Sequence, residues 1–290
     1  MMNAQERADA EHLIRTALAE DLGTGCDITS EILISPDELG NVGIVSRKEG
    51  VFCGGELIPL ILNAIDPRAE SEVLLQDGAA LQPGSLAARL HGPVRALLTA
   101  ERTILNFLTF LCGTASLTRR YVETANRPGV QILDTRKTVP GLRSLQKYAV
   151  RCGGGTNHRI GLYDAILVKD NHLAAWTANT RQPLAEAARH VRKVAPPGMV
   201  IQFEVDNLQQ LKEILPECPT MILLDNMSND QLREAVAIRD QLAPEVLLEA
   251  SGGVNLETVA GIAATGIDRI SVGALTHSAP ALDLGFDWLS

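Results

Sequence analysis

The sequence predicts an α/β fold in which a parallel (β/α) barrel follows a separate N-terminal α/β layer. From about residue 130 onward, short apolar strands alternate with helical segments. Continuous runs of Val, Ile and Leu are typical of strands that are covered on both faces, as in parallel sheets. The last strand-to-strand steps are about 21 to 25 residues, close to the smallest βα unit, which favours a barrel over a doubly wound sheet.

The elements of this fold can be placed along the chain. Barrel strands are expected at 130–135, 164–170, 199–205, 220–226, 245–251 and 268–274, with helices between them. Before the barrel, 41–57 and 70–94 have the pattern of strands, with Asp-Gly and Pro-Gly turns in the second segment. Residues 93–125 form a long helical pattern with a core-facing apolar stripe. We expect one domain over 1–112 and a catalytic barrel over 113–277, with 278–290 packed back near the first domain.

Composition excludes several classes of protein. The 290 residues are 46% hydrophobic, which suits an enzyme-sized folded core and argues against disorder. No apolar run approaches the roughly 18 residues of a membrane span, and the acidic, amphipathic start is unlike a signal peptide, so a cytoplasmic protein is expected. Five scattered cysteines without a CxxC pair suit reduced, packed thiols. The net charge of −9 and the 3% aromatic content argue against nucleic-acid binding.

Positive charge is concentrated in one stretch of this acidic chain. Residues 135–172 hold seven Lys and Arg against two Asp, whereas the remaining chain holds nineteen against thirty-three Asp and Glu. Part of this stretch has an ordinary explanation, because Arg143, Lys147 and Arg151 are spaced by four, and such a helix face is usually solvated or paired surface. The other cations favour an anion-binding site.

Polar or very small residues stand at the carboxyl end of each expected barrel strand. In a (β/α) barrel these ends meet at one mouth, where the chemistry takes place. A single polar residue at a strand end means little, but six successive ends of types that bind anions and cations indicate an active site. The residues are Asp134 and Arg136, Lys169, Glu204, Asp225, Ser251 with Gly252, and Gly273.

With these residues identified, the chain resembles the quinolinate phosphoribosyltransferase family, also called nicotinate-nucleotide pyrophosphorylase (carboxylating). The resemblance covers nearly the whole chain. It rests on EDLGTGCDITS, LTAERTILNFL, LDTRKTVPGLRSLQKYAVRCGGGTNHRIGLYDAILVKDNH, FEVDNL, LLDNM, ASGGVN and SVGALTHS. It implies an N-terminal α/β sandwich joined to an incomplete, roughly seven-stranded α/β barrel. It also implies homodimers, or hexamers built from them, in which one subunit's N-terminal domain covers its neighbour's barrel mouth.

The resemblance implies transfer of a phosphoribosyl group from phosphoribosyl pyrophosphate (PRPP) to quinolinate, with release of pyrophosphate and CO2, giving nicotinate mononucleotide for NAD biosynthesis. Quinolinate carries two carboxylates, which arginine forks and lysine charges suit. The implied quinolinate-binding residues are Arg102 from the neighbouring subunit, Thr135, Arg136, Lys137, His158, Arg159 and Lys169.

The same resemblance implies sites for PRPP and Mg²⁺. Glu204 and Asp225 are expected to handle the ribose hydroxyls and the metal, directly or through water, because Mg²⁺ prefers hard oxygen ligands. Glycines let the backbone approach a 5′-phosphate closely. The implied PRPP-binding residues are Lys137, Lys169, Glu204, Asp225, Ser251, Gly252, Gly253, Gly273 and His277, and those expected to carry the chemistry are Lys137, Lys169, Glu204 and Asp225.

One position departs from the family pattern, and three other functions stay open. The family often has Glu two residues before the strand-end Glu, whereas this chain has Gln202, which bears on metal or ribose contacts. A related phosphoribosyltransferase branch, associated with molybdate transporters, uses another acceptor base. Lys169 at a barrel strand end also suits a Schiff-base lyase. A non-catalytic PRPP-binding subunit is the third, and intact Glu204 and Asp225 argue against it.

Overall fold

The structure, a computed structural model, describes residues 1–180 and 183–289. They form two compact units. The first comprises Met1–Arg119, Thr138–Gly154 and the chain from Leu275 onward, and the second comprises Arg120–Lys137 and Gly155–Ala274. The domain boundary predicted after residue 112 falls inside the long helix α4, Val94–Ala125, and stays a prediction.

The first unit is built on a four-stranded antiparallel sheet in the order β12-β1-β5-β3. The last strand, β12 (Leu284–Trp288), pairs with the first strand, β1 (Leu39–Ser46), so the first and last strands share one sheet. The remaining strands are β2 (Gly50–Val51), β3 (Glu70–Val73), β4 (Ala80–Leu81) and β5 (Leu86–Pro93). The helices with residues in this unit are α1 (Ala4–Leu22), α2 (Ile28–Leu33), α3 (Leu57–Ile65), α4, α5 (Arg143–Cys152) and α11 (Ala274–His277).

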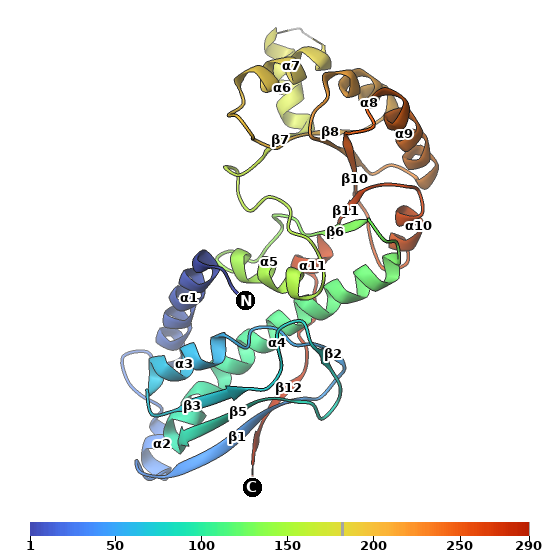
Figure 1. Cartoon of the computed structure of the whole chain (residues 1–290). Coiled ribbons are helices and arrows are strands. Elements are labelled where there is room, and N and C mark those ends of the chain that lie inside the picture. The colour runs from blue at the N-terminus through green and yellow to red at the C-terminus, as the bar shows by residue number, and fades with distance from the viewer. Residues whose placement is uncertain (181–182, 290) are drawn as a thin grey trace. The chain divides into compact units, whose positions relative to one another are not determined.

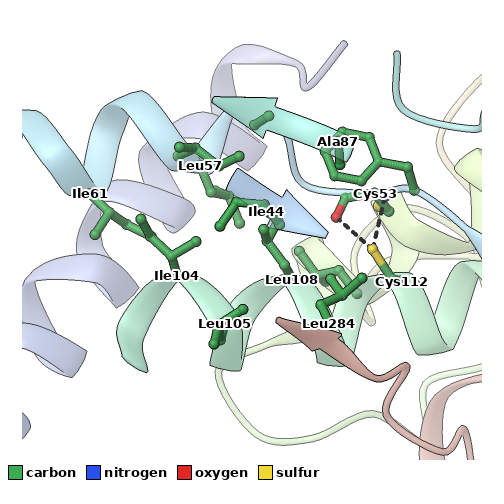
Figure 2. Close-up of a cluster of buried hydrophobic side chains, with 14 of the residues drawn as sticks. Ile44, Cys53, Leu57, Ile61, Ala87, Ile104, Leu105, Leu108, Cys112 and Leu284 are labelled. Carbon is green, nitrogen blue, oxygen red and sulfur yellow. Dashed lines mark hydrogen bonds between the residues drawn. The ribbon is translucent and has the colours of Figure 1, made fainter. Parts of the chain in front are cut away.

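The core of the first unit lies between this sheet and helices α3 and α4. Ile104 and Leu108 stand four residues apart on α4, so they share the helix face that is buried. Leu57 and Ile61 do the same on α3, and Ile44 meets them from β1, as Figure 2 shows. Each such side chain contributes about 1.5–3 kcal/mol by leaving water. The predicted apolar stripe of the long helix is therefore confirmed as a core-facing stripe.

Helix α5 carries three of the seven cations in the basic stretch. Arg151 forms two hydrogen bonds with the carboxylate of Glu6 on α1, at 2.8 and 2.9 Å, and Arg143 donates to the Thr138 hydroxyl. Lys147 is only 2% exposed. The expectation of a solvated or paired surface therefore holds for Arg151 and is wrong for Lys147, whose stem is packed inside the unit. The basic stretch is thus divided between the two units.

The second unit contains six parallel strands in the order β6-β11-β10-β9-β8-β7. All six lie where the sequence predicts them: β6 (Gln131–Leu133), β7 (Ile166–Val168), β8 (Ile201–Val205), β9 (Met221–Asp225), β10 (Leu247–Ser251) and β11 (Arg269–Ser271). This is barrel order with one open seam, between β6 and β7. The expected seventh strand is reduced, in the described chain, to a single parallel bridge between Leu133 and Thr156.

Helices cover the outer side of this curved sheet, as Figure 1 shows for α8, α9 and α10. Their bounds are α6 (Asp170–Thr180), α7 (Leu184–Val194), α8 (Leu208–Ile214), a 3-10 turn at Leu215–Glu217, α9 (Asn229–Leu242) and α10 (Val259–Ala263). Among the described helices, none combines the length and hydropathy needed to cross a membrane.

Replacing Leu108 with Ala should destabilise the first unit. Leu108 is 0% exposed, so its removal leaves a cavity, and we expect a loss of about 2–5 kcal/mol in the free energy of unfolding, measured in urea. Leu242→Ala is the control: that side chain is 53% exposed, and the loss should stay below about 0.5 kcal/mol. Equal losses would contradict the packing described for α4.

Candidate active site

The carboxyl ends of the six parallel strands bring most of the predicted site residues to one edge of the sheet. β6 is followed by Thr135, Arg136 and Lys137, and β7 by Lys169. Glu204 is the penultimate residue of β8, and Asp225 and Ser251 end β9 and β10. Gly273 follows β11. Because parallel strands all end on the same side, these residues share the barrel mouth, as predicted.

Two arginines of the mouth lie within range of each other's charge. Arg136 is half-buried, and its Nε is buried without a hydrogen-bond partner among the described residues. Burial lowers the pKa of the Arg159 guanidinium, and the positive charge of Arg136 lowers it further, with Asp164 acting in the opposite direction. Arg159 also donates through Nη1 to the carbonyl of Ala165, at 3.2 Å. Two neighbouring guanidiniums, one with an unpaired buried N–H, form a site prepared for an anion.

The His158 ring makes two contacts within the protein. Its Nδ1 accepts a hydrogen bond from the backbone N–H of Arg159 at 2.7 Å, and its Nε2 lies 3.3 Å from Oε1 of Glu249. An accepting Nδ1 means that the proton is on Nε2, which donates to the carboxylate. Both ring nitrogens are therefore engaged within the protein. The expected contact between His158 and a quinolinate carboxylate stays a prediction.

Glu249 was not predicted as a site residue. It is 0% exposed, and its oxygens accept from His158, from the Ser271 hydroxyl, and from Nε2 of Gln202 at 3.0 Å. The Nε of Arg269 lies 3.4 Å from Oε2. Burial alone would raise the pKa of Glu249, but the hydrogen bonds from His158 and Ser271 and the charge of Arg269 outweigh it, so the pKa is lowered. The available signal was a Glu inside an apolar strand, on the same face as Ser251.

The same cluster explains the departure at Gln202. This side chain is 1% exposed and donates its amide N–H to Glu249. A Glu at position 202 would bring a second carboxylate against a buried one, which is unfavourable without an added proton or cation. Gln202 therefore stabilises the Glu249 carboxylate by supplying a donor. Because its amide is used in this way, a direct role of Gln202 as a metal ligand is disfavoured.

Lys169 forms an ion pair with Glu204, with 2.9 Å between Nζ and Oε2. The lysine side chain is 46% exposed and that of the glutamate 11%, so the pair sits at the opening of the mouth. Lys137 is exposed after β6, and its backbone N–H donates to the Thr135 hydroxyl. Two cations for a phosphate or carboxylate are thus present, and Lys169 is balanced by the carboxylate of Glu204.

The ends of β9 and β10 form the glycine-lined part of the mouth. Asp225 and Ser251 are paired in register, and Asn226 donates its backbone N–H to the Ser251 carbonyl and its amide to the Asp225 carboxylate. Gly252 has φ +93°, and a Cβ there would clash with Oδ1 of Asn226. Gly253 has φ +62°, with nothing within 4 Å of an added Cβ. The backbone at Gly253 is therefore open to a ligand, as the predicted phosphate site requires.

Two predicted site residues belong to the first unit. Arg102 is exposed on α4, and His277 ends α11, with Nδ1 2.7 Å from the Ser278 hydroxyl. Their assignment to the quinolinate and PRPP sites remains a prediction from the family resemblance.

Two groups of side chains have the chemistry to hold a metal ion. Glu204 and Asp225 present carboxylates on neighbouring strands, a donor set that fits Mg²⁺. In the first unit, ligand atoms of Cys53, Asp77 and Cys152 lie within 4.8 Å of one another. There, however, the Asp77 oxygens accept from the N–H groups of Gly54 and Gly55 and from Tyr148. Asp77 in this second group therefore stabilises the loop after β2 by hydrogen bonds. All five cysteines are free thiols.

Comparison with known proteins gives one consistent family. A family model described as quinolinate phosphoribosyl transferase, N-terminal domain, matches residues 27–112, and the C-terminal domain model matches 114–287. The chain is 44% identical over 289 residues to a nicotinate-nucleotide pyrophosphorylase (carboxylating) of Mycobacterium leprae, covering 99% of this chain and 100% of that one. A quinolinate phosphoribosyltransferase (decarboxylating) of Nicotiana tabacum is 35% identical over 291 residues, covering 95% and 81%.

Solved structures agree with these sequence matches. A nicotinate-nucleotide pyrophosphorylase from Francisella tularensis superimposes with a TM-score of 0.88 at 38% identity, over 97% of this chain and 96% of that one. The corresponding protein from Ehrlichia chaffeensis gives 0.88 at 37% identity, over 96% and 98%.

Adding a methyl group at Gly252 should disturb the mouth more than adding one at Gly253. Both glycines have positive φ, which costs an L-residue about 1–2 kcal/mol. Gly252→Ala must also displace Asn226, so we expect about 1–3 kcal/mol of further destabilisation in urea unfolding. Equal losses in the two variants would contradict the close approach of Gly252 and Asn226.

Proposed function

Because the chain belongs to the quinolinate phosphoribosyl transferase family, we propose that it transfers a phosphoribosyl group from PRPP to quinolinate, with decarboxylation to nicotinate mononucleotide, a step of NAD biosynthesis. The observation that carries the proposal is the pair of arginines at the barrel mouth, Arg136 and Arg159, where the buried Nε–H of Arg136 has no partner among the described residues. A small diacid offers the two negative groups that such a pair requires.

The chemistry asks mainly for positioning and charge. The pyridine nitrogen forms a bond to C1 of the ribose as the C1–oxygen bond to pyrophosphate breaks. The 2-carboxylate then leaves as CO2, and the electron pair remains beside the quaternised ring nitrogen, where the substrate itself stabilises it until a proton is added. Arg136 and Arg159 hold the diacid in the orientation for attack, so the enzyme needs no nucleophile of its own.

The phosphoribosyl donor occupies the other half of the mouth in this proposal. Ser251, Gly252, Gly253 and Gly273 receive the 5′-phosphate through hydroxyl and backbone N–H groups, with His277 as a further donor. Lys137 and Lys169 face the pyrophosphate. Since Lys169 is paired with Glu204, an arriving phosphate competes for that ammonium and releases the carboxylate.

Glu204 and Asp225 act on the ribose hydroxyls and on Mg²⁺ in this scheme. Mg²⁺ would neutralise charge on the leaving pyrophosphate, and it usually keeps several waters while taking one or two carboxylates. The two carboxylates also stabilise positive charge that develops at the ribosyl centre.

We further propose a cytoplasmic homodimer, or a hexamer of such dimers, in which Arg102 of one subunit serves its neighbour's mouth. Helix α2 supports an association surface: Ile28, Ile32 and Leu33 are 69%, 75% and 72% exposed. Clustered exposed apolar side chains of this size mark protein contacts. The five free thiols suit a reducing compartment.

Reversing the charge of Arg136 should abolish quinolinate binding while the fold stays intact. In Arg136→Glu a carboxylate faces the diacid, so calorimetry should detect no quinolinate binding and the assay of quinolinate consumption with PRPP no turnover. Arg233→Glu on the exposed face of α9 is the matched control and should retain both. Wild-type protein that consumes another base with PRPP, but not quinolinate, would contradict the proposed acceptor.

Mixing two inactive variants tests the role of Arg102. If Arg102 acts across the dimer, Arg102→Ala and Arg136→Glu subunits together restore one intact site per heterodimer, or about a quarter of wild-type activity at random mixing. The measurement is turnover after the two proteins are mixed and allowed to exchange subunits. Absence of recovery, with heterodimers shown by native mass spectrometry, would place Arg102 in its own subunit's site.

A further inference from the structure

The segment that carries Arg159 lies in the open seam of the barrel. Between β6 and β7 the described residues form only the bridge from Leu133 to Thr156, so no ladder of backbone hydrogen bonds fixes 157–165. The proposed quinolinate site nevertheless needs the Arg159 guanidinium to stay near that of Arg136, although the two positive charges repel each other. Something other than strand pairing must hold this segment.

Two buried carboxylates provide that hold, Asp134 from the end of β6 and Glu249 from β10. Asp134, after β6, is 0% exposed and accepts from the Asn157 amide at 2.6 Å and from the His158 backbone N–H at 2.9 Å. Glu249, from the middle of β10, accepts from the His158 ring. Asp134 thus fixes the backbone at His158, and Glu249 fixes the side chain of His158.

The His158 ring passes this constraint on to Arg159. Its Nδ1 accepts the Arg159 backbone N–H at 2.7 Å, which is possible only while that nitrogen carries no proton. A carboxylate on Nε2 favours this tautomer, because it requires a donor there. The chain of contacts runs from Glu249 through His158 to the backbone of Arg159.

The other partners of Glu249 keep it in place. Gln202 from β8 and Ser271 from β11 donate to it, and Arg269 lies at 3.4 Å. The carboxylate therefore has donors from three neighbouring elements and cannot rotate without leaving one of them unsatisfied. A buried, fully bonded group of this kind makes a rigid anchor.

We propose that Glu249 is a positioning residue for the dicarboxylate acceptor: through the Nε2–H tautomer of His158, it sets the segment that carries Arg159 so that this guanidinium faces the ligand. The inference rests on the proposed function. It gives His158 a role in orienting Arg159, in addition to the quinolinate contact that the family resemblance implies.

Glu249→Gln tests the proposal, since it keeps the shape of the side chain but places an amide N–H2 against the Gln202 or His158 donors. We expect quinolinate affinity, measured by calorimetry, to fall by about tenfold or more, because small displacements of a binding group carry losses up to about 100-fold. PRPP affinity should stay within about threefold. Asp268→Asn, which removes a partly buried carboxylate that is paired with Arg239, is the control and should leave quinolinate affinity unchanged.

A double-mutant cycle separates positioning from general destabilisation. If Glu249 acts through His158, the loss caused by Glu249→Gln should shrink to less than about threefold in a His158→Ala background. Additive losses would overturn the proposed route through His158. Quinolinate affinity unchanged in Glu249→Gln would overturn the positioning role itself.

The wild-type protein gives an independent readout that does not depend on a folded variant. Ring ¹⁵N resonances of labelled His158 should report the Nε2–H tautomer at pH 8, and an Nδ1–H tautomer would overturn the proposal. Wild-type protein that binds no quinolinate at all would instead contradict the proposed function, while leaving the tautomer result as a separate test.

Discussion

The repulsion between Arg136 and Arg159 is the constraint on which the site depends. Arg136 and Arg159 are both half-buried at the mouth, and burial and the like charge of Arg136 both lower the pKa of Arg159. Such a pair is unfavourable by itself and becomes favourable when an anion joins it. The protein therefore has to hold the two groups in place before the ligand arrives, and the barrel architecture decides how it can do so.

The barrel meets this requirement with two kinds of support. Most mouth residues, such as Asp225 and Ser251, follow strands that are paired on both sides, so the sheet itself fixes them. Arg159 instead lies in the segment between β6 and β7, where the described residues form only the bridge between Thr156 and Leu133 of β6. Buried carboxylates replace strand pairing there. The most cationic part of the mouth is thus held by the most deeply buried acidic groups, Asp134 and Glu249.

Much of this arrangement could be predicted from the sequence. Apolar runs of Val, Ile and Leu located all six parallel strands, and parallel strands bring their carboxyl ends together, so Lys169, Glu204 and Asp225 were placed at one mouth by topology alone. The periodicity of apolar residues does not predict which distant residue a polar side chain will contact. Lys147 has surface spacing but is buried, and His158 looks like a clamp residue but is engaged on both nitrogens. Glu249 was missed because it lies within an apolar strand and its partners come from distant parts of the sequence.

The most direct measurement of the central claim is a crystal structure of the protein with quinolinate bound. We expect the two carboxylates to lie between Arg136 and Arg159, with the buried Nε–H of Arg136 donating to one of them and the pyridine nitrogen facing Ser251 and Asp225. Quinolinate bound away from this pair, or bound there with the Arg136 Nε–H still unpartnered, would contradict the account.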